Sequence, residues 1–236
     1  MDFNGFTQKD INVLNVDRIE GLPDIMVGRI PASTPDEVMT YVNKVIDYEF
    51  NAYDSDWFKK ALWIVDGAFG APVKKDRLDG YMSDFTIIKR YQNQSPWNTM
   101  SLTELAPELN QQINSGLGFV NYFGHGNRSI WTNNIEHWYH TSYIGNLTNE
   151  DMLPIIYAVS CNTGRYIWYG CDNDGQDSYL DKNGSPWSYN TCSTKTARPQ
   201  PNVIQPESYD RESFAEKFLV KQAAGAIAYI GATSKH

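Results

Sequence analysis

The stretch LGFVNYFGHG, residues 117–126, gives the clearest indication of the fold. Residues 117–123 are mostly aromatic and aliphatic and do not alternate with polar residues, which is typical of a strand covered on both faces. Comparable apolar runs occur along the rest of the chain, at residues 25–30, 61–66, 86–91, 154–160 and 226–232. We therefore predict a sheet in which residues 117–123 are the fourth of six strands.

Segments with helical spacing separate these runs. Residues 33–37 supply a cap, a first-turn proline and acidic residues, and the helix that follows repeats apolar residues on one face: Val38, Tyr41, Val42, Val45 and Ile46. Residues 101–104 have the form of a capping box and begin a stripe that ends at Gly116. Further helices are predicted at 211–224 and 78–85. Strands interleaved with helices predict an α/β fold, a three-layer sandwich with a mainly parallel central sheet.

The composition of the 236 residues, 41% hydrophobic and 20% charged, is that of an ordinary globular protein. A net charge of -8 disfavours binding to a polyanion, so we expect no nucleic-acid partner. No apolar run reaches the roughly 18 residues of a membrane span, and residues 1–20 lack the pattern of a signal peptide. Because the chain closes on a strand that runs into a loop, AGAIAYIGATSKH, we expect a fragment whose parent carries further domains.

Three reactive side chains follow predicted strands. Asp66 ends the run at 61–66, His125 follows 117–123, and Cys161 follows 154–160. In open parallel sheets ligands bind beyond the carboxyl ends of the strands, so these side chains are expected to meet at one cleft. A thiol, an imidazole and a carboxylate are the groups of a Cys-His nucleophile pair with an acidic orienting residue, which predicts acyl transfer.

The residue types suit that chemistry. A cysteine attacks as the thiolate, and an ordinary thiol pKa of about 8.5 leaves little thiolate at neutral pH unless an imidazolium lies close. We assign Asp66 to the far ring nitrogen of His125, and the N–H groups of Gly126 and Cys161 to an oxyanion hole. The structural alternatives are a turn-forming Asp66, a tight Gly-His-Gly turn and an unreactive buried Cys161.

Four segments carry a resemblance to a known family: residues 22–49, the NYFGHG segment followed by Trp131, LPIIYAVSCNTG at 153–164, and residues 212–232. In order and spacing they resemble the gingipain family of cysteine peptidases. The resemblance implies a caspase-like fold, a single peptidase domain over 1–236, His125 as catalytic histidine and Cys161 as nucleophile. Asp66 falls where the family places the acidic partner of the histidine. Residues 165–209 depart from the family pattern and are interpreted as an insertion that borders the cleft.

The function that follows is a cysteine endopeptidase that cleaves peptide bonds through an acyl-enzyme thioester, with protein or peptide substrates. No cofactor or catalytic metal is needed for this chemistry. The alternatives are a sortase-like transpeptidase, in which an amine replaces water, and a non-catalytic binding or scaffold module. The family members that cleave after Arg or Lys use an acidic pocket residue, and the resemblance places Asp76 or Asp79 in that neighbourhood, but no motif selects either one and basic specificity is not predicted. Because members of this family are exported, the resemblance implies a secreted or cell-surface protein of bacterial origin.

Several other motifs have weaker functional interpretations. Residues 172–177, DNDGQD, hold three carboxylates in the density that suits a structural calcium ion, although the spacing is not that of an EF-hand. His137 and His140 have the spacing of a zinc-binding pair, but no second pair accompanies them, so an aromatic-rich turn is preferred. The alternative to the calcium site is a solvated acidic loop. Cys171 and Cys192 flank this polar segment and could close it through a disulfide in an oxidising compartment.

Overall fold

The computed structural model describes residues 28–52, 55–66, 76, 79–131, 139–166, 179–180, 186–187 and 212–233. The chain divides into two compact units, Met1–Ile30 and Pro31–His236, and all the elements described below belong to the second. The strand predicted at 25–30 is not formed over residues 28–30, so that part of the prediction is wrong. Residues 25–27 lie outside the described residues. The single domain over 1–236 stays a prediction.

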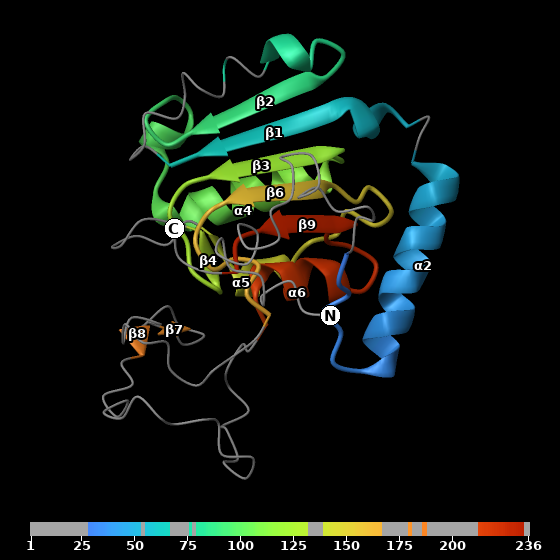
Figure 1. Ribbon diagram of the computed structural model, residues 1–236. Coiled ribbons are helices and arrows are strands. Elements are labelled where there is room, and N and C mark those ends of the chain that lie inside the picture. Colours follow the sequence, from blue (N-terminus) through green and yellow to red (C-terminus); the bar gives the residue numbers. More distant parts are fainter. Residues whose placement is uncertain are drawn as a thin grey trace, which may run out of the picture. The chain divides into compact units, whose positions relative to one another are not determined.

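A parallel sheet of five strands forms the centre of the second unit (Figure 1). Every pair of neighbouring strands is parallel, and the order across the sheet is β2 (Thr86–Tyr91), β1 (Lys60–Val65), β3 (Phe119–Phe123), β6 (Ile155–Val159) and β9 (Ala228–Gly231). These strands lie where five of the six apolar runs predicted them. The α/β class with a mainly parallel sheet is therefore confirmed. Two short antiparallel pairs accompany it: β4 (Ile130–Trp131) with β5 (Tyr139–His140), and β7 (Tyr179–Leu180) with β8 (Pro186–Trp187).

The helices begin where the capping signals predict. Thr34 caps α2 (Pro35–Asn51) in a capping box with Glu37, and Ser101 with Glu104 does the same for α4 (Leu102–Asn114). The predicted helix at 211–224 is shorter, α6 (Phe214–Val220), and the predicted helix at 78–85 is reduced to a single turn, η4 (Asp79–Tyr81). The remaining helical elements are η2 (Asp56–Lys59), η5 (Trp97–Thr99) and α5 (Thr141–Ile144). No helix within the described ranges combines the length and apolarity needed to cross a membrane.

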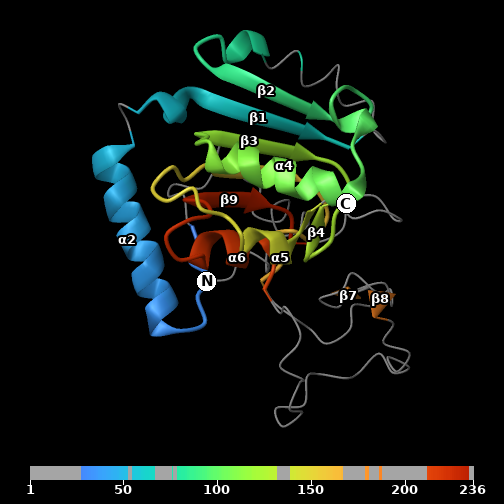
Figure 2. The ribbon, with the colours of Figure 1, turned by 180° about the vertical axis from the view of Figure 1, so that it is seen from behind.

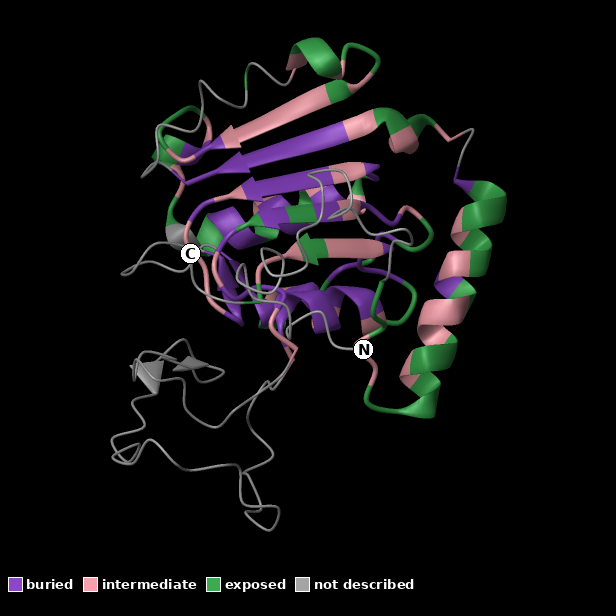
Figure 3. Cartoon of the chain, viewed as in Figure 1, coloured by how far each residue is buried: buried purple, intermediate pink, exposed green. Residues whose placement is uncertain are grey.

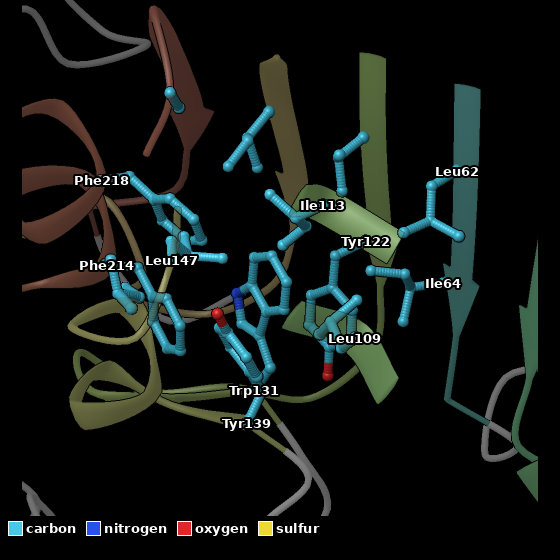
Figure 4. Close-up of a cluster of buried hydrophobic side chains, with 14 of the residues drawn as sticks. Leu62, Ile64, Leu109, Ile113, Tyr122, Trp131, Tyr139, Leu147, Phe214 and Phe218 are labelled. Atoms are coloured by element: carbon cyan, nitrogen blue, oxygen red, sulfur yellow. The ribbon is translucent and has the colours of Figure 1, made fainter. Parts of the chain in front are cut away.

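The main core lies between the sheet and three helices, α4, α5 and α6, which cover the same face (Figures 2 and 4). Alternate residues of the strands point into it, as the period of two in a strand requires. The largest side chains of this core that are fully buried are Trp131, Tyr122, Tyr139, Phe214, Phe218, Leu62, Ile64, Leu109, Ile113, Leu117 and Ile144. Burial of these residues fixes which face of each strand turns towards the helices.

The opposite face is covered unevenly (Figure 3). Near β1 and β2 it holds a small buried cluster of Ala61, Trp63, Val65 and Tyr91. Towards the other edge, Tyr157, Val159 and Ile230 are exposed. The expectation that every strand is covered on both faces is thus correct for β1 and wrong for β6, whose burial alternates along the strand.

The apolar stripe predicted for α2 is only partly covered: Tyr41, Val42 and Val45 are half-buried, whereas Val38 and Ile46 are exposed at 40% and 47% of their full accessibility. The helix contacts α6 through other atoms: Lys44 Nζ donates to the carbonyl oxygens of Phe218 (3.2 Å) and Leu219 (3.0 Å). These carbonyls belong to the last turn of α6, where backbone acceptors have no partner within the helix. The buried amine of Lys44, together with Tyr41, whose Oη donates to Ile227 O (3.0 Å), therefore connects α2 to the rest of the fold.

Replacing Lys44 with methionine is expected to change how stability depends on pH. Burial, and to a smaller extent the charge of Lys221, lowers the pKa of Lys44 to about 7. In the unfolded chain the amine titrates near 10.4, so between these values the unfolded state binds more protons and the free energy of unfolding rises with pH. From pH 7 to pH 9 this contributes roughly 2 kcal/mol, which Lys44→Met should lose.

Urea unfolding of wild type and Lys44→Met at both pH values measures this contribution. Lys59→Met, at an exposed lysine, serves as the matched control and should show no such difference. An equal pH dependence in wild type and Lys44→Met would contradict the prediction.

Candidate active site

His125 and Cys161 follow strands that are neighbours in the sheet. Phe123 of β3 is paired in register with Val159 of β6, and one further bond, from Gly124 N to Val159 O (3.2 Å), extends the ladder. His125 is two positions beyond Phe123, and Cys161 is two positions beyond Val159. Because side chains alternate along strands, the two residues occupy equivalent positions at the same edge of the sheet. Both are partly accessible to solvent.

Asp66 lies at the same edge, after β1, and is fully buried at 0% exposure. Its N–H donates to Phe123 O (2.9 Å), and its Oδ2 accepts a hydrogen bond from the backbone N–H of His125 (3.3 Å). The carboxylate therefore holds the backbone that carries the histidine. That Asp66 also orients the imidazole stays a prediction.

Tyr122 is a second support of the histidine that the sequence patterns did not identify. Its hydroxyl donates to the carbonyl oxygen of His125, and its ring stacks on Trp131 with 4.6 Å between ring centroids. Burial, followed by the charge of Asp66, raises the pKa of Tyr122 well above its ordinary value, so the hydroxyl keeps its proton and remains a donor. In the sequence, Tyr122 is marked only by a position in the apolar run that points into the core, and a tyrosine with no role beyond core packing would occupy the same position.

The chain turns sharply after Cys161. Asn162 is buried and has a φ of 56°, in the left-handed region, which asparagine tolerates better than most residues. The turn is closed by Arg165 N donating to Asn162 O (3.0 Å), and it is tied to the end of β9 by Gly164 N donating to Ala232 O (2.9 Å). Cys161 is thus the last residue before a turn that backbone hydrogen bonds close and tie to the end of β9.

The segment after His125 is anchored to α6. Gly126 bridges Trp131, and Arg128, which is buried, has Nη2 3.2 Å from Oε2 of Glu216. Glu216 also closes the capping box of α6 with Ser213. Neither Arg128 nor Glu216 stood out in the sequence, because their pairing depends on folding that brings distant segments together.

Asp76 and Asp79, the candidates for an acidic pocket, are both engaged by Lys89. Lys89 Nζ forms an ion pair with Asp76 and lies 2.6 Å from Asp79 Oδ2. Tyr91 Oη also donates to Asp76 Oδ1 (3.1 Å), and Trp63 Nε1 to Asp79 Oδ1 (3.0 Å). A basic substrate side chain would have to compete with Lys89 for these carboxylates, which weakens the hypothesis of basic specificity based on them.

The remaining candidate motifs fall mostly outside the described residues: Cys171, Cys192, His137 and residues 172–177. His140 is described, and its Nδ1 accepts from Ser142 N (3.0 Å) at the start of α5, a capping role. Across the ranges that the structure covers, no group of three or more histidine, cysteine, aspartate or glutamate side chains could hold a metal ion. The calcium and zinc sites therefore stay predictions from the sequence.

The architecture defines an α/β protein with the fold of the gingipain peptidases. The crystal structure of the Arg-specific cysteine proteinase gingipain R matches with a TM-score of 0.58, over 87% of this chain and 39% of that one, at 19% identity. The complex of the pro- and mature domains of Porphyromonas gingivalis RgpB matches with a TM-score of 0.60, over 90% and 42%, at 18% identity. A family model, Peptidase family C25, matches residues 3–236, and the chain belongs to this family.

Similarity to curated proteins supports the same family assignment. Gingipain R2 of Porphyromonas gingivalis is 23% identical over 154 residues, which are 61% of this chain and 20% of the relative. Lys-gingipain W83 from the same species is 26% identical over 168 residues, 69% of this chain and 9% of the relative. An uncharacterized protein of Archaeoglobus fulgidus is 22% identical over 233 residues, 89% of this chain and 47% of the relative. The chain thus spans a small part of the gingipains.

Proposed function

We propose that this chain carries the catalytic centre of a cysteine endopeptidase, with Cys161 as nucleophile and His125 as its acid–base partner. The observation that carries the proposal is the register of β3 and β6, which pairs Phe123 with Val159 and so sets both reactive residues the same distance beyond neighbouring strands. Adjacent parallel strands are about 4.8 Å apart, a separation that side chains of this length can bridge.

In the proposed reaction the Cys161 thiolate attacks the carbonyl carbon of a peptide bond. The carbonyl electron pair moves onto oxygen, which accepts hydrogen bonds from the N–H groups of Gly126 and Cys161. As the carbon–nitrogen bond breaks, His125 gives its proton to the leaving amine, and a thioester remains on Cys161. His125 then takes a proton from water, whose oxygen attacks the thioester and releases the carboxylic acid and the thiolate.

The supports described above give this centre its rigidity. Asp66 and Tyr122 hold the N–H and the C=O of His125 respectively, so both sides of the histidine's backbone are tied to the sheet. Catalytic groups held in place by neighbouring hydrogen bonds lose less entropy on reaching the reactive geometry. Protein or peptide substrates, export from a bacterial cell and a structural calcium ion at residues 172–177 belong to the same proposal.

Alkylation by iodoacetamide at about pH 6 tests the nucleophile. An ordinary thiol with a pKa near 8.5 is almost entirely protonated there, whereas a thiolate paired with an imidazolium still reacts. In protein that has first been reduced, so that Cys171 and Cys192 are free thiols, we expect Cys161 to react at least about tenfold faster than those two, and His125→Gln to remove this advantage. His236→Gln, at the last residue of the chain, should leave it intact.

Equal alkylation of all three thiols, together with no cleavage of a peptide library by the longer parent protein, would instead indicate a scaffold module. Adding an amine nucleophile to the parent distinguishes the remaining outcomes. Free carboxyl ends in the products support the endopeptidase, and ligated products would replace it with a transpeptidase.

A further inference from the structure

Ser160, the residue before Cys161, is buried at 8% exposure at the end of β6. The alternation of β6 turns it to the same side as Ile156 and Ala158, towards the helices, and away from the side of Cys161. Within the described part of the chain, its Oγ is shielded from solvent and has no hydrogen-bond partner. A buried hydroxyl without a partner typically costs about 1–3 kcal/mol, so its presence calls for a compensating role.

The neighbour of that hydroxyl is Gly126. A Cβ added to Gly126 would overlap with Ser160 Oγ, and its next contacts, Ile130 O and Thr163 Cγ2, would be at 3.1 Å. The serine hydroxyl therefore occupies the space that a side chain at position 126 would need. Gly126 also forms an antiparallel bridge to Trp131. The peptide at Gly126 is thus in contact with both the β4 segment and Ser160.

We propose that Ser160 is a positioning residue for the oxyanion hole: contact of its hydroxyl with Gly126 holds the Gly126 N–H beside the Cys161 N–H. This inference rests on the proposed function, in which those two N–H groups receive the oxyanion. The effect is one of contact and volume, since the hydroxyl forms no hydrogen bond in the described structure. Ser160 itself touches no reacting atom.

The test separates two reactions of the same thiolate in the full 236-residue chain. Iodoacetamide alkylates Cys161 by displacement at a saturated carbon and develops no oxyanion. 4-Nitrophenyl acetate acetylates it: the sulfur–carbon bond forms, an oxyanion develops, and the carbon–oxygen bond breaks as 4-nitrophenolate leaves with the electron pair. Both rates are read by mass spectrometry of the peptide that contains Cys161.

For Ser160→Ala we expect acetylation to fall about threefold to tenfold while alkylation changes less than twofold, because only acetylation uses the oxyanion donors. The thermal midpoint should stay equal or rise, since an unpartnered hydroxyl has been removed. Ser83→Ala, at an exposed turn, is the control and should change neither rate.

The double variant gives the sharpest result. Gly126→Ala alone should slow acetylation at least about tenfold, because the new methyl group displaces the peptide from Ser160. Combining it with Ser160→Ala removes the overlapping Oγ, so acetylation should be faster in the double variant than in Gly126→Ala. A double variant as slow as or slower than Gly126→Ala, or an equal loss of alkylation and acetylation in Ser160→Ala, would overturn the proposal.

The outcomes also separate this inference from the function on which it rests. If wild-type Cys161 is neither acetylated nor alkylated faster than Cys171 and Cys192, the proposed function fails. If wild-type Cys161 reacts readily and acetylation is unaffected by Ser160→Ala and Gly126→Ala, only the positioning role fails.

Discussion

Trp131→Ala is expected to lower the free energy of unfolding by about 3–5 kcal/mol, the cost typical of emptying a large aromatic site in a core. Trp131 is only 1% exposed and lies between two rings, stacked on Tyr122 at 4.6 Å and on Phe214 at 4.9 Å between centroids. Its Nε1 also donates to Tyr229 Oη (3.4 Å). The indole therefore connects β3, β9 and α6 at once, and no single neighbour can move to fill the space.

Denaturant unfolding followed by circular dichroism measures this loss. Trp131→Phe keeps part of the stack and should lose less than half as much, while Trp57→Ala, at a partly exposed tryptophan of η2, should cost about 1 kcal/mol. A loss below about 1 kcal/mol for Trp131→Ala would show that the aromatic stack does not hold the sheet to α6.

Asn149→Ala should be nearly as damaging, with a loss of about 2–4 kcal/mol. The fully buried amide of Asn149 makes three hydrogen bonds to the backbone: it donates to Met152 O (2.8 Å) and Gly225 O (3.0 Å) and accepts from Gly225 N (2.9 Å). Gly225 has a φ of 99°, and a side chain there would overlap with Phe218 O. The amide thus supports the turn between α6 and β9, and alanine would remove this partner from the two buried backbone groups of Gly225 and from the half-buried carbonyl of Met152.

The matched control is Asn146→Ala, an exposed asparagine in the same segment, which should change stability by less than about 0.5 kcal/mol. Thermal and urea unfolding of both variants provide the comparison. If the two substitutions cost the same, the clamp on Gly225 contributes nothing to stability.

The elements that local chemistry governs could be predicted. The runs 86–91 and 117–123 became β2 and β3 with at most a shift of the first residues, and the capping boxes at Thr34 and Ser101 open α2 and α4. A cap depends on residues within one turn, and an apolar run is visible without knowledge of its neighbours. The extent of burial could not be read in the same way, since tertiary packing half-buries Tyr41, Val42 and Val45 of the α2 stripe and leaves Val38 and Ile46 exposed.

In the candidate site, too, some residues could be predicted from the sequence and others could not. His125, Cys161 and Asp66 were predicted as site residues because each has a chemically reactive side chain and lies at or just beyond the end of an apolar run. The residues that support them were not predicted, because in the sequence Tyr122 and Ser160 resemble ordinary strand residues. Only the structure shows that the Tyr122 hydroxyl donates to His125, and that the Ser160 hydroxyl has no hydrogen-bond partner within the described region.

The order of residues along this chain was sufficient to predict the five strands of the central sheet, the caps of α2 and α4, and the reactive side chains that follow the strands, because these depend on neighbours a few positions away. Only the tertiary structure decided that Phe123 pairs with Val159, that Ser160 abuts Gly126, and that Lys44 reaches the end of α6. Such pairings join segments far apart in sequence, and they form only when the burial of a whole core compensates the entropy of bringing the segments together.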